Sequence, residues 1–171
     1  MSELLMGNFI YSKKFTRWDK GSIITYLVIS ILVLYYYWDR GKLEENSQLI
    51  IFYSISTQLY LYLFNYRSLR NFKVYLIWFI IGLLHLFFYF QLKDLDSVQM
   101  INGNASQGLR NTVLMLVLFQ ALRFVSLKIQ NLELVPADRS GFNDLDERII
   151  SMVDYILFVI YFGMTAFLAM Y

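Results

Sequence analysis

The chain has 171 residues, of which 58% are hydrophobic, 19% aromatic and 16% charged, and its net charge at neutral pH is +2. A soluble domain usually carries about 25% charged residues, so the composition argues against a water-soluble fold, and the small net charge argues against a nucleic-acid partner. The absence of cysteine excludes disulfides, thiol catalysis and thiolate metal sites.

The apolar residues fall into five blocks, each close to the length that a membrane-crossing helix needs. A bilayer core of about 30 Å requires roughly 20 mainly apolar residues in a helix. Hydrocarbon offers no partner for backbone amides, so each block is expected to be helical despite its β-branched and aromatic residues. The blocks are 22–38, 49–66, 74–92, 109–129 and 149–171. The predicted fold is an all-α, polytopic integral membrane protein, a single transmembrane domain over residues 1–171 with a bundle of five helices.

The second block is short and is interrupted by Ser54, Ser56, Thr57 and Gln58. A bundle of four transmembrane helices, with this one lying shallow in the membrane, therefore stays open. The tail 1–21 mixes apolar residues with lysine and arginine, a pattern typical of either an interfacial amphipathic helix or a disordered basic tail. The apolar stretch after it lacks a small-residue cleavage pattern, which favours an uncleaved first span over a signal peptide.

Lysine and arginine are unevenly distributed between the two sides that five spans create. The tail 1–21, the turn 67–73 and the loop 128–148 together hold ten of these residues, whereas the two loops on the other side hold four. Because positively charged loops stay in the cytoplasm, the N-terminus is expected there. The abundance of Ile, Phe, Tyr and Asn is typical of an AT-rich bacterial genome. We therefore expect a multi-pass protein of a bacterial inner (cytoplasmic) membrane.

Arg123 lies inside the fourth block and needs a partner. It is six residues from the cytoplasmic end of that block, and Asp154 is five residues from the start of the next, so the two lie at matching depth. An unpaired charge at the bilayer centre costs about 2.5 to 3.5 kcal/mol. We predict a structural ion pair between Arg123 and Asp154. Snorkelling of Arg123 to the interface and a charge that lines a pathway are the alternatives.

Four further polar residues fall inside the predicted spans: Gln58, His85, Gln120 and Thr165. Gln58, His85 and Thr165 belong to polar stripes on single helix faces, and such stripes face other helices rather than lipid. Gln58 and Gln120 lie at similar depth, so their amides could bond across helices. The expected role of the four is inter-helix contact, and the alternative is that they line a pore. A proton relay at His85 also stays open.

The loop 128–148 is the expected cytoplasmic contact surface for a partner. Asn143 is placed to cap the fifth helix, with three carboxylates in its first turn, where the helix dipole favours them. The candidate interaction residues of the loop are Pro136, Arg139, Asn143, Asp144, Asp146 and Glu147.

No residue is assigned a catalytic, metal-binding or cofactor-binding role. The run "NDLDE" at 143–147 invites comparison with the magnesium-binding motifs of membrane transferases. Those sites need two acidic clusters on facing helices, and the other acidic pair here, Asp94 and Asp96, lies across the membrane. A single histidine cannot form a multi-histidine metal centre.

These features predict a small, non-enzymatic inner-membrane protein that acts through inter-helix polar contacts as a scaffold or anchoring subunit of a membrane complex. Its expected partners are the lipid bilayer and other membrane subunits or copies of itself. The alternative is an oligomeric ion channel or pore lined by the intramembrane polar residues. A membrane enzyme comes third, because the sequence holds no catalytic set and a thin bundle leaves little room for a substrate.

Overall fold

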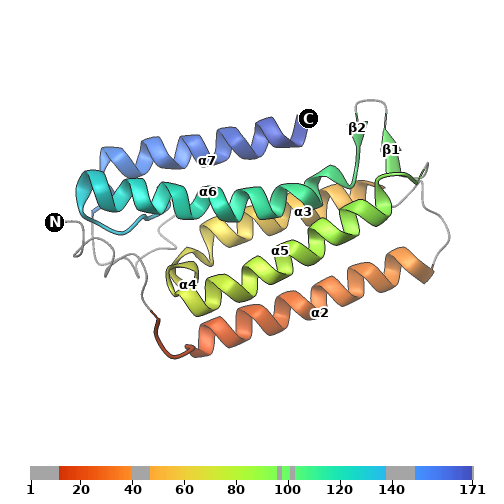
Figure 1. Cartoon of the computed structure of the whole chain (residues 1–171), viewed down its shortest axis with the longest axis horizontal. Coiled ribbons are helices and arrows are strands. Elements are labelled where there is room, and N and C mark those ends of the chain that lie inside the picture. The colour runs from red at the N-terminus through yellow and green to blue at the C-terminus, as the bar shows by residue number, and fades with distance from the viewer. Residues whose placement is uncertain (1–11, 40–46, 96–97, 101–102, 138–148, 171) are drawn as a thin grey trace.

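The computed structural model describes residues 12–39, 47–95, 98–100, 103–137 and 149–170. Its elements are α2 (Arg17–Asp39), α3 (Ser47–Leu63), α4 (Tyr66–Arg70), α5 (Phe72–Leu92), β1 (Gln99–Met100), β2 (Gly103–Asn104), α6 (Gln107–Gln130) and α7 (Met152–Met170). The long helices run side by side along the long axis of the molecule, with α4 at one end and the short β1–β2 hairpin at the other (Figure 1). We call these the α4 end and the hairpin end.

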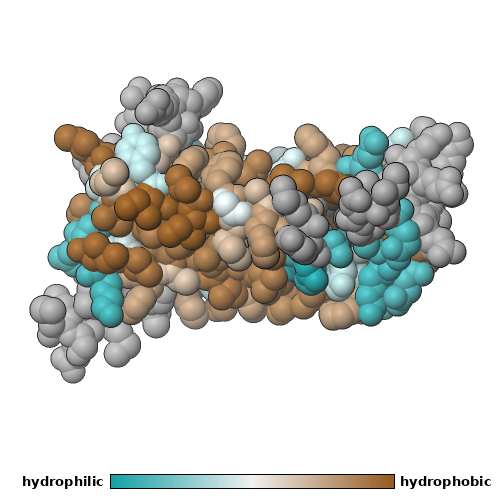
Figure 2. All heavy atoms as spheres, turned by 90° about the horizontal axis from the view of Figure 1, so that it is seen from above, coloured by the Kyte–Doolittle hydropathy of each residue, from teal (hydrophilic) through white to brown (hydrophobic). Residues whose placement is uncertain are grey.

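Four of the described helices are long and apolar enough to cross a membrane: Arg17–Tyr36, Phe72–Leu92, Gln107–Gln130 and Met152–Ala169. α3, with 17 residues, is shorter than each of them. Hydrophobic side chains cover the middle of the long axis, and hydrophilic ones gather towards its two ends (Figure 2). The predicted helical class is confirmed and is consistent with a membrane protein, whereas a fifth span through α3 stays a prediction.

α2 begins at Arg17, five residues before the apolar block predicted at 22–38, because a capping box precedes it. The Thr16 hydroxyl oxygen accepts a hydrogen bond from the backbone N–H of Asp19 at 3.1 Å. In return, the Asp19 carboxylate accepts one from the backbone N–H of Thr16 at 2.7 Å. This reciprocal pair satisfies donors that a helix start leaves open. Residues 17–21, predicted as part of the tail, are therefore helical.

A second capping box starts α7 at Met152, three residues after the predicted start at 149. The Ser151 hydroxyl oxygen accepts from the backbone N–H of Asp154 at 3.2 Å, and the Asp154 carboxylate accepts from the backbone N–H of Ser151 at 2.9 Å. The cap that the structure shows is thus Ser151, whereas the cap predicted at Asn143 lies outside the described residues.

α6 forms the centre of the bundle and packs against α5, α7 and α3. Two glycines permit close approach there. Gly108 of α6 lies so close to Ser54 of α3 that an added Cβ would overlap the serine hydroxyl. Gly82 of α5 lies against Val113 and Leu116 of α6. Small residues at helix crossings are typical of packing in membranes, where close contact replaces hydrophobic driving force.

Candidate functional site

His85 lies where four helices meet, and it is 5% exposed. Its Nε2 atom is 3.0 Å from the hydroxyl oxygens of both Tyr26 of α2 and Tyr53 of α3. Its Nδ1 atom is 3.2 Å from the hydroxyl oxygen of Thr112 of α6. The Tyr26 hydroxyl is also 2.8 Å from that of Tyr53 and 3.0 Å from that of Thr57. We call these five side chains the histidine hub.

The hydrogens of the hub can be placed with the imidazole neutral. The Thr57 hydroxyl donates to the backbone carbonyl of Tyr53 at 2.7 Å, so its oxygen is left to accept from the Tyr26 hydroxyl. The Tyr26 oxygen then accepts from the Nε2–H of His85, and Nδ1 accepts from Thr112. Among the described residues, none that bonds to the hub carries a charge. We therefore assign His85 as a neutral connector between helices.

Arg123 is 1% exposed and forms an ion pair with a carboxylate other than the predicted one. Its Nε and Nη2 atoms donate to the two carboxylate oxygens of Glu133, each at 2.7 Å, and its Nη1 atom donates to Gln120 at 3.4 Å. Arg70 of α4 contacts the same carboxylate at 3.7 Å and donates to the backbone carbonyl of Leu134 at 2.5 Å. Glu133 thus joins an arginine of α4 to an arginine of α6, the latter in a bidentate pair.

Asp154 belongs to a separate cluster between α6 and α7. Its carboxylate accepts from Gln130 at 3.1 Å and from the Ser151 hydroxyl at 2.8 Å. Gln130 also donates to the hydroxyl of Ser126 at 2.8 Å. Among the ion pairs of the described residues, Arg123 joins Glu133 rather than Asp154, which corrects the predicted partner.

A chain reversal directly after α6 explains why Glu133 takes this place. Asn131 ends the helix in the left-handed conformation, with φ of 55°, a conformation that asparagine tolerates better than most residues. The following residues turn back towards Arg123, and residues 134–137 are buried.

The burial of this segment changes the predicted contact surface. Pro136 is buried, which contradicts its expected place in a loop that is exposed to a partner. The other residues of that predicted surface lie outside the described residues: Arg139, Asn143, Asp144, Asp146 and Glu147.

Gln58 and Gln120 each cross to another helix, but through backbone carbonyls rather than through each other. Gln58 donates to the carbonyl of Gly108 of α6 at 3.0 Å, and Gln120 donates to that of Leu69 of α4 at 2.9 Å. Thr165 differs from the prediction, because its hydroxyl donates to a backbone carbonyl one turn earlier in its own helix at 3.0 Å. A hydroxyl can satisfy itself in this way where a longer amide cannot.

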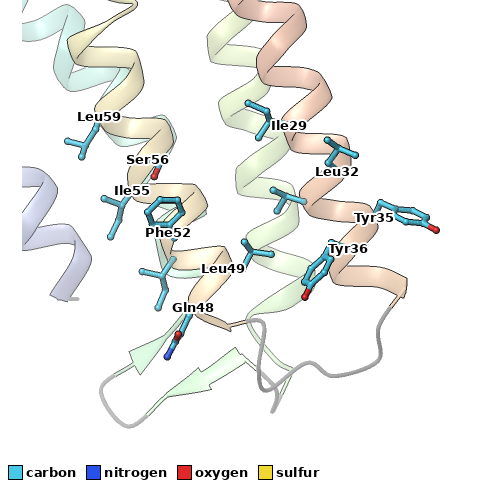
Figure 3. Close-up of a pocket in the computed structure, with 12 residues that line it drawn as sticks. Ile29, Leu32, Tyr35, Tyr36, Gln48, Leu49, Phe52, Ile55, Ser56 and Leu59 are labelled. Carbon is cyan, nitrogen blue, oxygen red and sulfur yellow. The ribbon is translucent and has the colours of Figure 1, made fainter.

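A groove of about 1150 Å³ lies between α2 and α3, in the half of the bundle nearer the hairpin end. Figure 3 shows Ile29 and Leu32 on α2 and Phe52 on the neighbouring α3, with Gln48 at the end nearer the hairpin. None of the described residues that line the groove is charged. We call it the α2–α3 groove.

A smaller hollow of about 210 Å³ continues the groove towards the α4 end, and the two share Ile29 and Ser56. Six of the seven residues that line the hollow carry a hydroxyl group, and three of those belong to the histidine hub. The hydroxyl-bearing residues are Thr25, Tyr26, Tyr53, Ser56, Thr57 and Tyr60. The groove therefore leads to a second hollow beside the hub, and the surface of that hollow is mainly apolar because most of these side chains turn their hydroxyl groups away from it.

The sequence analysis missed this hollow, although one signal for it was present. Tyr53, Ser56, Thr57 and Tyr60 recur every three or four residues and so share one face of α3. We interpreted Ser56 and Thr57 only as a dilution of an apolar block. The partner face on α2 contributes Tyr26, whose hydroxyl is hidden in an otherwise apolar helix.

No protein-family model matches the chain, and no curated protein or solved structure is similar to it. Within the described ranges, no group of three or more histidine, aspartate or glutamate side chains is placed to hold a metal ion. What the protein does must therefore be inferred from its own geometry.

Proposed function

We propose that the chain is a multi-pass membrane protein in which α3 also crosses the bilayer, giving five spans. At about 1.5 Å per residue, the 17 residues of α3 cover roughly 26 Å, and helices of about 17 to 25 residues span membranes. Lys13, Lys14, Arg67 and Lys73 lie near the α4 end. This basic end favours a cytoplasmic location for the N-terminus in a bacterial inner membrane.

Within that membrane, the protein acts as a non-enzymatic scaffold or anchoring subunit. The observation that carries this proposal is that its buried and partly buried polar groups bond to helices of the same chain. Gln58 bonds to α6, Gln120 to α4, and His85 to α2, α3 and α6. Such bonds contribute about 0.6 kcal/mol each in membrane bundles. A bundle that is joined internally and apolar outside is suited to holding other membrane helices in place.

The outer face of α2 is the surface that we propose for a partner subunit or a second copy. Ile24, Leu27, Val28 and Ile31 recur at helical spacing and are 41% to 64% exposed. This stripe is distinct from the α2 residues that line the groove, such as Leu32.

An oligomeric pore has less support. Two of the side chains expected to line it are buried inside one chain, with exposed fractions of 2% for Gln58 and 5% for His85. A pore between protomers needs polar side chains on an outer helix face, because only that face meets the central axis.

The span count can be tested directly because the sequence contains no cysteine. Single cysteines would be introduced at Lys14, Lys73 and Asp94, and labelled in intact cells with a membrane-impermeant maleimide. With five spans, only position 94 is labelled from outside. If α3 does not cross, position 73 is labelled and position 94 is protected, which would refute the five-span arrangement.

The scaffold role can be tested with a photo-cross-linking residue at Ile31, in membranes of the native host. We expect covalent adducts with another membrane chain or with a second copy. The matched control is Leu84 of α5, which is 51% exposed at a similar depth. A lack of adducts at Ile31, or the same adducts from both positions, would contradict the proposed surface.

A further inference from the structure

We propose that a pocket at the hairpin end binds a small, uncharged polyol, a ligand of the glycerol class. The pocket has a volume of about 200 Å³ and lies where α3, the start of α6 and the end of α7 meet the hairpin. Its polar lining includes Ser54 and Gln58 of α3 and Gln107 and Asn111 of α6. We call it the hairpin-end pocket. This inference goes beyond the scaffold role and does not require it.

Gln58 offers the pocket an amide oxygen that still needs a donor. The residue is 2% exposed, and its amide nitrogen donates to the carbonyl of Gly108 at 3.0 Å. Because a carbonyl only accepts, this bond identifies the remaining amide atom as the oxygen. None of the described residues donates to that oxygen, and Gln58 lines the pocket. A buried acceptor that lacks a donor is unfavourable, so the pocket favours a ligand that brings one.

Two neighbouring side chains add hydrogen-bonding capacity. The Ser54 hydroxyl donates to the carbonyl of Ile51 at 2.9 Å, so its oxygen can still accept. Gln107 is partly exposed, and its amide makes no hydrogen bond with a described residue. Gln58 and Ser54 thus need donors, whereas Gln107 can donate or accept. Hydroxyl groups meet both needs, whereas ketone and ether oxygens can only accept.

The lining also favours a ligand without charge. None of the described residues that line the pocket is charged. Arg110 donates to Asn111 at 3.3 Å, but its guanidinium lies over the ring of Tyr89 of α5, 5.7 Å from the centroid. A charged ligand would enter a site whose walls hold no opposite charge, which is unfavourable.

Size and access fit a small, water-soluble molecule. A volume of about 200 Å³ holds about seven groups the size of a water molecule, and a three-carbon chain with a hydroxyl on each carbon is of that size. Ile51, Ile55 and Leu168 provide apolar contacts for the carbons. Gln107 is the first residue of α6, and Asn111 lies only about 6 Å further along the helix. The pocket is therefore close to the end of the bundle, where a ligand can arrive from water.

Binding is tested on the purified full-length protein in lipid nanodiscs, by saturation-transfer NMR with glycerol as the probe and empty nanodiscs as the background. The competitors are glycerate, which adds a carboxylate, and 1,2-dimethoxyethane, whose oxygens only accept. We expect saturable binding of glycerol and at least tenfold weaker competition by either compound. A signal no larger than that of empty nanodiscs, or competition by glycerate or dimethoxyethane as strong as that by glycerol itself, would overturn the proposal.

Variants locate the site. Ala169→Leu adds bulk to the lining of the pocket and should weaken glycerol binding at least tenfold. Its control, Ala166→Leu, changes an exposed residue one turn earlier in α7, outside the lining, and should leave binding unchanged. Gln107→Met removes the partly exposed amide and should weaken binding several-fold without lowering the Tm. Equal binding by Ala169→Leu and Ala166→Leu would place the probe elsewhere and refute the site.

Discussion

α6 and α2 are both long enough to cross a membrane, but they are attached to the bundle in different ways. Of the membrane-length window in each helix, 44% is buried in α6 and 17% in α2. α6 packs against three long helices. α2 is instead joined to the bundle by polar contacts at two levels. Near the start of α2, Asp19 accepts a hydrogen bond from Ser68 of α4. Further along, Tyr26 and Ser30 bond with the hydroxyl of Tyr53 of α3. Apolar surface alone does not drive association in lipid, so close packing positions α6 whereas hydrogen bonds position α2.

The largest effect is expected for Arg123→Met in α6. The variant leaves the partly buried Glu133 carboxylate without its bidentate partner, and we expect a loss of about 3 kcal/mol of unfolding free energy. Denaturant unfolding in detergent measures it. A double-mutant cycle should show strong coupling of Arg123 to Glu133. Stronger coupling to Asp154 than to Glu133 would contradict the observed ion pair.

Gly108→Ala tests the close packing of α6 against α3. The added methyl group meets the Ser54 hydroxyl, and overpacking of this kind costs about 1 to 3 kcal/mol. Gly163→Ala in α7 is the matched control, because nothing lies within 4 Å of its added Cβ. Thermal melts should show a lower Tm only for Gly108→Ala, and equal shifts for the two variants would argue against tight packing at this crossing.

Tyr26→Phe tests the central attachment of α2. It removes the hydroxyl that bonds with His85, Tyr53 and Thr57, at a cost of about 2 kcal/mol if each of the three bonds contributes about 0.6. We expect greater mobility of a spin label on α2, with the label on α6 unchanged. Equal changes in both helices would show that α2 is not attached independently.

Ser68→Ala should have the smallest effect, about 1 kcal/mol, because it removes a single hydrogen bond to Asp19. The capping box between Thr16 and Asp19 stays intact, so only the first turn of α2 should exchange its amide hydrogens faster. Asp19→Ala removes the cap as well and should cost more. Similar exchange in the two variants would mean that the cap contributes little.

The helical class could be predicted because long apolar blocks admit few other structures. The helix starts were also readable, since Thr16–Asp19 and Ser151–Asp154 share the spacing of a capping box, but we placed the spans by hydropathy and the cap of the fifth helix at Asn143. Gln58 and His85 are buried at helix contacts, as their stripes suggested, and Gln120 is partly buried at one. Their partners were not predictable in detail, because backbone carbonyls carry no signature in a sequence.

The partner of Arg123 was missed for a physical reason. We looked for a partner by comparing the depths of residues along straight spans. Glu133 lies beyond the end of its span, in a segment that folds back, so this comparison did not include it. The signal was Asn131, a residue that accepts the left-handed conformation needed for such a reversal.

The α2–α3 groove was missed for a different reason. It arises from the separation of two helices, and no local sequence pattern specifies that separation.

The reversal at Asn131 also bears on how the protein is made. Glu133 follows Arg123 by only ten residues, so the counter-charge emerges from the ribosome almost together with the arginine. Asp154 emerges 31 residues after Arg123, with the next span. Because Glu133 supplies the carboxylate, α6 would enter the bilayer of the proposed membrane arrangement with its charge already neutralised, before α7 has been synthesised. Membrane insertion of the bundle can then proceed one helix at a time.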